Sequence, residues 1–153
     1  MVGFRIVRDD RDKGSLALPT SGIVVTVGDL LEQLEDEATT WTLVTTGSFC
    51  TSRKAIATQT VAATATEVNG VLLDGTELIE VGSANSSAVT DNGNGMIIGT
   101  ATTGAMTINN THTTVATNQD AQIFLQYGVV GAATDKRILG WVMVGNGPIH
   151  AAA

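Results

Sequence analysis

The sequence predicts an all-β fold: one small domain of the barrel or sandwich type, preceded by an extended N-terminal arm. The 153 residues are 43% hydrophobic but only 4% aromatic and 15% charged, whereas about 25% charged is usual. Thr and Val, which are stiff at χ1 and favour pleated strands, take up much of the difference. Seventeen Gly against two Pro indicate tight turns rather than linkers, and short β-prone segments recur between them.

The arm is predicted over residues 1–22 and the β-rich domain over residues 23–153. The first 22 residues show no sustained periodicity and carry a net charge of +1, while the rest of the chain carries −8. Chain ends are usually mobile unless something holds them. The arm offers apolar side chains that a neighbouring protein could bury, although a tail docked on its own domain is the alternative. These side chains are Phe4, Ile6, Leu16 and Leu18.

Residues 29–35 fit two structures. As a short helix they would place Leu30, Leu31 and Leu34 on one stripe. As a strand they would pair, across a turn at residues 36–38, with residues 40–44. We favour the strand.

Two Asx-Gly pairs give the clearest local signal in the chain. Asn69-Gly70 and Asp74-Gly75 tolerate the positive φ angles that tight hairpins require. We expect both pairs to form turns, with strands on either side at residues 71–73 and 76–81. Further β-prone segments lie at residues 54–58, 60–66, 96–98, 105–108, 122–127 and 137–144, which makes about eight to ten short strands.

A catalytic site is not expected, so the chain is predicted not to be an enzyme. Nucleophilic catalysis needs a base within reach of the nucleophile, and the two histidines, His112 and His150, lie in a Thr/Asn-rich segment and near the C-terminus. Cys50, the single cysteine, is more typical of a small core or surface residue than of a nucleophile. The acidic groups at residues 32–37 and at residues 77 and 80 are expected to be solvated faces.

No cofactor or metal is expected either. The segment from Asp91 to Gly95 offers oxygen ligands, but an EF-hand would continue to a Glu at its twelfth position, which here is Thr102. A glycine-rich loop is the preferred interpretation.

The charge of the chain argues against nucleic-acid and membrane partners. Its formal net charge is −7, and both partners require Lys and Arg to replace counterions. One cysteine allows no intrachain disulfide, and the N-terminus has no apolar signal-peptide stretch. Synthesis in a cytoplasm is therefore expected. Trp41 and Trp141 lie in β-prone segments and are predicted to be core or subunit-contact residues.

Four segments, at residues 28–32, 41–44, 53–57 and 66–81, resemble in pattern and order the lambda-type head decoration (capsid cement) proteins of tailed bacteriophages. The last of them reads TEVNGVLLDGTELIEV. The similarity covers about residues 23–81 and rests on an Ala-rich strand followed by an Asx-Gly turn and an acidic, β-branched strand.

The resemblance implies a small β-tulip or barrel-like fold in a virion protein of the capsid surface. Such proteins assemble as homotrimers at three-fold and quasi-three-fold positions and bind the major capsid protein of the expanded head. The N-terminal arm would add a strand to a capsid sheet, so a chain lacking residues 1–18 would fold but not bind. The arm residues implied in binding are Phe4, Arg5, Ile6, Val7, Arg8, Leu16 and Leu18.

Two other functions fit the same composition. One is a different β-rich virion component, such as a tail-tube, fibre or shell protein. The other is a carbohydrate-binding β-sandwich module, which would need an exposed aromatic platform.

Overall fold

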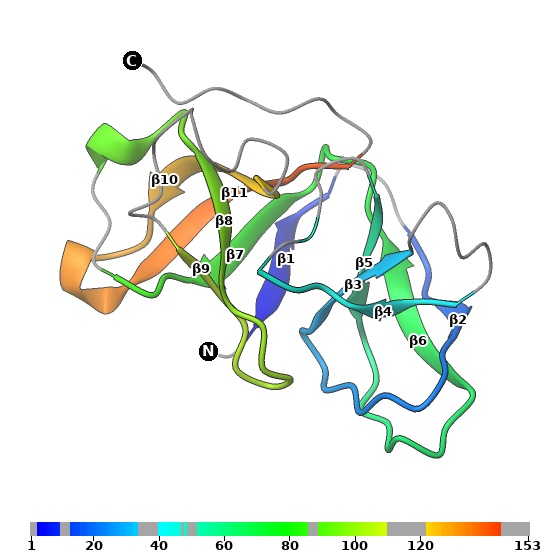
Figure 1. Cartoon of the computed structure of the whole chain (residues 1–153). Coiled ribbons are helices and arrows are strands. Elements are labelled where there is room, and N and C mark those ends of the chain that lie inside the picture. Colours follow the sequence, from blue (N-terminus) through cyan, green and yellow to red (C-terminus); the bar gives the residue numbers. More distant parts are fainter. Residues whose placement is uncertain are drawn as a thin grey trace.

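Two antiparallel sheets make up the computed structural model of the chain, which confirms the predicted all-β class (Figure 1). The structure describes residues 3–9, 13–33, 40–46, 48, 52–85, 89–109 and 122–144. Within these residues the only helical elements are two 3₁₀ turns, Val89–Asp91 and Ala133–Asp135. No helix of the described part is long and apolar enough to cross a membrane.

The larger sheet has six strands in the order β1-β7-β11-β10-β8-β9. Its neighbouring strands come from distant parts of the sequence, because β1 pairs with β7 and β7 pairs with β11. The strands are β1 (Phe4–Arg8), β7 (Leu78–Gly82), β8 (Gly95–Thr100), β9 (Thr107–Asn109), β10 (Phe124–Val129) and β11 (Arg137–Val142).

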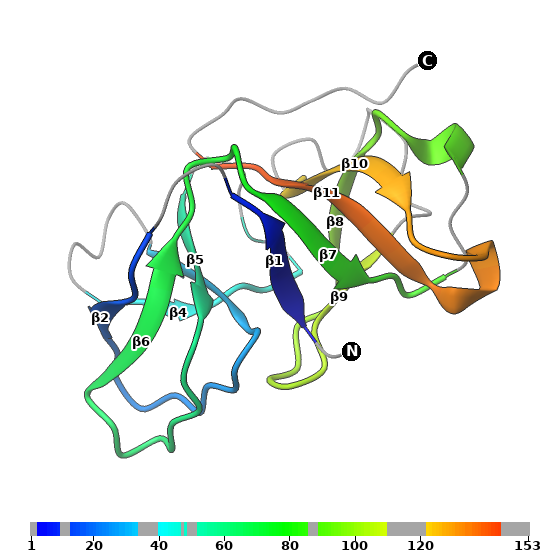
Figure 2. The same ribbon diagram turned by 180° about the vertical axis from the view of Figure 1, so that it is seen from behind.

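The smaller sheet has five strands in the order β2-β6-β5-β3-β4 and lies beside the larger one, as both views show (Figures 1 and 2). Its strands are β2 (Leu16–Pro19), β3 (Leu30–Gln33), β4 (Thr42–Leu43), β5 (Arg53–Ala57) and β6 (Glu67–Leu72). Residues 60–66, which were expected to form a strand, contribute only a bridge between Val61 and Val25 and a turn.

The N-terminal segment is not an extended arm in this structure. It supplies an edge strand to each sheet: β1 pairs with β7, and β2 pairs with β6. Phe4 and Leu18 are buried at 2% and 4% exposure. In the structure the segment is therefore a tail docked on its own domain, and the burial of these two side chains stabilises the docked position. We now expect removal of residues 1–18 to destabilise the fold.

Of the described residues in the segment 29–35, Leu30–Gln33 form strand β3 and Asp29 directly precedes it. Leu31 pairs with Leu43 and Glu32 pairs with Thr42, so β3 and β4 make the predicted antiparallel pair. The turn expected at residues 36–38 lies outside the described residues. The strand prevails over the helix because both of its faces are covered: Leu30 packs in one core cluster and Leu31 in the other.

The turn predicted at Asn69-Gly70 was wrong, since both residues lie inside β6. Gly70 is needed there for close approach rather than for a positive φ. A Cβ at this position would lie 2.8 Å from Leu18 Cδ1 and 3.1 Å from the Ile56 carbonyl oxygen. Glycine therefore lets β6 pack beneath the Leu18 side chain of β2.

The turn predicted at Asp74-Gly75 is confirmed, with Gly75 at φ +90°. It is a corner and not a hairpin, because β6 and β7 belong to different sheets. The Glu77 carboxylate, 1% exposed, accepts hydrogen bonds from the Asp74 and Gly75 backbone N–H groups and pairs with the Lys13 ammonium. One buried acid thus fixes the corner and ties the β1–β2 connection to it.

We expect Glu77→Gln to lower the free energy of unfolding by about 2–3 kcal/mol. The substitution removes the buried ion pair with Lys13, and it places the NH₂ group of the glutamine opposite backbone N–H donors. Urea denaturation measures the effect. Glu67→Gln is the matched control, since Glu67 is exposed in β6; equal effects of the two substitutions would contradict this role for Glu77.

A shared apolar core joins the two sheets. The main cluster combines residues of the larger sheet, such as Phe4, Ile79 and Phe124, with Leu30 and Ile56 of the smaller one. A second cluster lies on the opposite face of β3 and includes Leu18, Val25, Leu31, Trp41 and Val68.

A buried acid also links the sheets. The fully buried Asp29 carboxylate accepts hydrogen bonds from the Thr26 and Gly104 N–H groups, both at 2.8 Å, and from the Thr103 hydroxyl. Residues 103 and 104 lie between β8 and β9. This contact therefore fastens the start of β3 to the larger sheet.

Candidate docking face

One side of the six-stranded sheet faces away from the main core, and we call it the outer face. Strand side chains alternate between the two sides, so Ile79 and Val81 enter the core while Leu78 and Glu80 point outward. The same alternation holds in β11, where Ile138 and Val142 point inward. The outer-face residues are Arg5, Arg8, Leu78, Glu80, Leu125, Tyr127, Arg137, Leu139 and Trp141.

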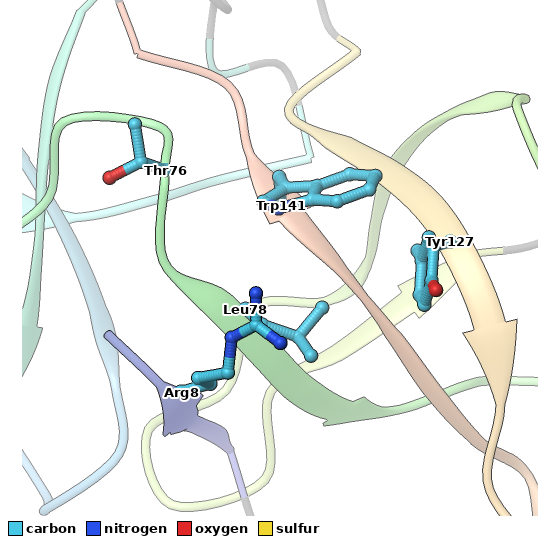
Figure 3. Close-up of a pocket in the computed structure, with 5 residues that line it drawn as sticks. All are labelled: Arg8, Thr76, Leu78, Tyr127 and Trp141. Atoms are coloured by element: carbon cyan, nitrogen blue, oxygen red, sulfur yellow. The ribbon is translucent and has the colours of Figure 1, made fainter. Parts of the chain in front are cut away.

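A pocket of about 190 Å³ opens on this face. It draws Arg8 from β1, Leu78 from β7, Trp141 from β11 and Tyr127 from β10, which are four neighbouring strands, together with Thr76 from the corner (Figure 3). The Tyr127 and Trp141 rings meet edge to face, with centroids 5.1 Å apart and an interplanar angle of 66°. Tyr127 is 57% exposed, so the pair offers aromatic surface to a ligand.

Register explains how the two aromatic residues meet. Leu125 pairs with Trp141, and the pairing shifts between Gln126 and Gly128. Tyr127 is the residue in this irregularity, and such a bulge re-aims a side chain.

Positive charge lies on the same face as the pocket. The buried Glu80 carboxylate lies between two guanidinium groups: Arg5 pairs with one oxygen and Arg137 with the other. Two cations thus share one anion. With Arg8, the outer face holds three of the five arginines of a chain whose net charge is −7.

The residues predicted to bind a partner separate into three groups. Phe4 and Leu18 are buried, and Ile6 packs against the main core, so these three stabilise the chain itself. Val7 and Leu16 are exposed at 48% and 52%. Arg5 and Arg8 lie on the outer face.

The two tryptophans have different environments. Trp41 is 5% exposed in the second core cluster and donates its backbone N–H to the Pro19 carbonyl oxygen. Trp141 lines the pocket.

The carboxylates that were expected on solvated faces are buried where the structure describes them. Glu77 and Glu80 have the partners given above. Glu32, 3% exposed, accepts hydrogen bonds from the Ser48 hydroxyl at 2.7 Å and from the Ser52 hydroxyl at 3.1 Å. The expectation was wrong because sequence spacing does not reveal which donors surround an acid.

A serine–lysine contact lies in the same cluster. The Lys54 Nζ donates to the Ser52 Oγ at 2.6 Å and to the Ser52 carbonyl oxygen at 3.0 Å. Both side chains are buried, Lys54 completely and Ser52 at 4% exposure, so a substrate does not reach the hydroxyl. We assign the cluster a structural role. Cys50, His112 and His150 lie outside the described residues.

The Asp91–Gly95 segment is organised by Gln126. The Gln126 amide donates to the Asn92 Oδ1 at 3.0 Å, and the Gln126 carbonyl oxygen accepts from the Gly93 N–H at 2.8 Å. Among the described residues, no group of three His, Cys, Asp or Glu side chains is placed to hold a metal ion.

Comparison with protein-family models, with curated proteins and with solved structures finds no match to this chain.

Proposed function

We propose that this protein is a structural component of a bacteriophage capsid, a decoration protein that stabilises the expanded head by binding its outer surface. The observation that supports adhesion is the outer face, where Trp141, Tyr127 and Arg8 surround a pocket. Trp, Tyr and Arg are the residues that most often dominate the free energy of protein–protein binding. The resemblance of residues 23–81 to decoration proteins gives the proposal its specific form, with the major capsid protein as partner and a homotrimer as the assembly.

Adhesion suits the mechanical task. Packaged DNA pushes capsid subunits apart, and a protein bound across a seam opposes this in proportion to the surface that it buries. An interface of roughly 1,600 Å² corresponds to tens of kcal/mol before the costs of association, at about 25 cal/mol per Å² of its apolar part. If the seam forms only when the head expands, binding selects the expanded state.

In this proposal the outer face binds the capsid, and the N-terminal segment supports it. β1 is the last strand of its sheet, so a capsid strand would add to its open edge while β1 stays paired with β7 and Phe4 stays buried. The docked segment also presents Arg5 and Arg8, which would meet capsid carboxylates.

Sedimentation with heads tests the proposal. We expect the purified protein to sediment with expanded heads of its cognate major capsid protein and not with unexpanded ones. Trp141→Ala should weaken binding about 30-fold, which corresponds to the ~2 kcal/mol typical of a dominant contact. Leu16→Ala is the control, because Leu16 is an exposed apolar residue of the other sheet. Absence of binding to either form of head would refute the proposal.

The solution mass separates this function from other β-rich virion components. A decoration protein of this kind is expected to be a trimer, or a monomer that trimerises on the head. A hexamer or an open polymer would indicate a tail-tube or shell protein.

The exposed aromatic pair also favours a second candidate, a carbohydrate-binding module. Aromatic faces are common platforms for ligands that combine apolar and polar surface. Glycan-array binding that disappears in Tyr127→Ala would support this function in place of the first.

A further inference from the structure

We propose that the outer-face pocket recognises an acidic aromatic segment of another protein: one large aromatic side chain flanked by Asp or Glu. This inference rests on the proposed adhesive function and names the chemistry of the partner. It depends on the size of the pocket, the character of its walls and the charge around it.

The size of the pocket suits one side chain. Pockets for drug-sized ligands usually measure about 300–1,000 Å³, whereas this one measures about 190 Å³. An apolar cavity of about 150 Å³ in another protein accepts one benzene molecule. The outer-face pocket therefore has room for about one aromatic ring of a partner.

The walls suit an aromatic ring. Leu78 supplies an aliphatic surface, and Tyr127 and Trp141 supply two rings already at an angle of 66°. Edge-to-face and offset arrangements are the favoured geometries of aromatic neighbours. A third ring placed against this pair can adopt one of them with each partner.

The surrounding charge selects anionic neighbours of that ring. Arg8 lies in the pocket wall, and Arg5 and Arg137 together carry one more positive charge than the Glu80 carboxylate neutralises. Guanidinium groups bind carboxylates through paired, charge-assisted hydrogen bonds. These groups are spread from β1 to β11 rather than gathered at one point. That spread suits carboxylates spaced along a segment better than a single terminal carboxylate.

Charge also sets this face apart from the rest of the molecule. The chain as a whole has a net charge of −7, whereas the charged side chains of the outer face are three arginines and one glutamate. Differences in electrostatic potential direct a charged partner toward the surface of opposite charge, which for an acidic segment is the outer face.

Capped peptides test the inference in the intact protein. One probe is an N-acetylated, C-amidated five-residue peptide with Phe between two Asp residues; the comparison peptides carry two Asn in place of Asp, or Ala in place of Phe. Titration is followed by ¹⁵N NMR at the two indole N–H signals, which Trp141→Phe assigns. The buried Trp41 serves as an internal control.

We expect the Asp–Phe–Asp peptide to shift the Trp141 indole signal and leave the Trp41 signal in place. The Asn peptide and the Ala peptide should each bind at least tenfold more weakly. Arg8→Gln should weaken binding of the acidic peptide at least fivefold, whereas Arg53→Gln, at an exposed arginine of the other sheet, should have no effect.

Equal affinities for the Asp and Asn peptides, or an unmoved Trp141 signal, would overturn the inference. Head binding is measured separately. Sedimentation that depends on Trp141 without peptide binding would refute only the acidic aromatic chemistry. Peptide binding without head binding would refute the capsid function and leave the recognition chemistry in place.

Discussion

Replacing Phe4 with alanine is expected to lower the free energy of unfolding by about 3–4 kcal/mol, one of the two largest effects that we predict. Phe4 is 2% exposed and packs in the main core, and truncation of a buried Phe removes its burial and leaves a cavity. For a domain of this size the loss corresponds to a decrease of roughly 10 °C in Tm. Urea and thermal denaturation measure both quantities.

Val7→Ala is the control on the same strand, because Val7 is 48% exposed. Its effect should remain within about 1 kcal/mol, in the range typical of exposed substitutions. If Phe4→Ala were as mild as Val7→Ala, the N-terminal segment would be a free arm in solution and the docked description of β1 would fail.

Gly140→Ala is expected to destabilise the protein by about 3 kcal/mol or to prevent folding. Gly140 lies in β11 opposite Gln126 and Ile79. A Cβ there would collide with the Leu125 carbonyl oxygen and lie 2.6 Å from the Phe124 ring. Neither can move without disturbing the sheet or the core, and overpacking of this kind is strongly unfavourable.

Gly128→Ala provides the matched control for this substitution. Gly128 lies in β10, the strand paired with β11, and a Cβ there would meet nothing within 4 Å. We expect its effect on the unfolding midpoint in urea to be small. Similar midpoints for the two variants would contradict the close packing of Phe124 beneath β11.

The strands that could be predicted from the sequence are those with a locally β-prone composition. The segments predicted at residues 54–58 and 137–144 overlap β5 (Arg53–Ala57) and β11 (Arg137–Val142). Excluding the alternative of a helix at residues 29–35 required tertiary information, namely that Leu30 and Leu31 pack in different core clusters. Local propensity alone did not distinguish a helical stripe from a strand buried on both sides.

The errors share one physical cause, which is contact between residues far apart in the sequence. Asn69-Gly70 has the composition of a turn, yet Gly70 lies in a strand because Leu18 covers it. Glu80 looked like a solvated acid, yet residues 75 positions earlier and 57 positions later supply its two guanidinium partners. Neither contact can be predicted from a short window of sequence.

The candidate site was predicted only in part. Arg5, Arg8 and Trp141 were named, but Tyr127, Leu78 and Arg137 were not placed with them. A hairpin between residues 122–127 and 137–144 would have brought Tyr127 near Trp141, and this was the one available signal. The pairing of β1 with β7, which brings Arg8 to Leu78, had no such signal.

The claim that the outer face binds the capsid is tested most directly by hydroxyl-radical footprinting of the free and the head-bound protein. The account predicts that oxidation of Tyr127 and Trp141 falls at least fivefold on binding, while the exposed side chains of Leu16, in the smaller sheet, and Val24 keep their reactivity. A protein that sediments with heads while Tyr127 and Trp141 remain as reactive as in solution would contradict it.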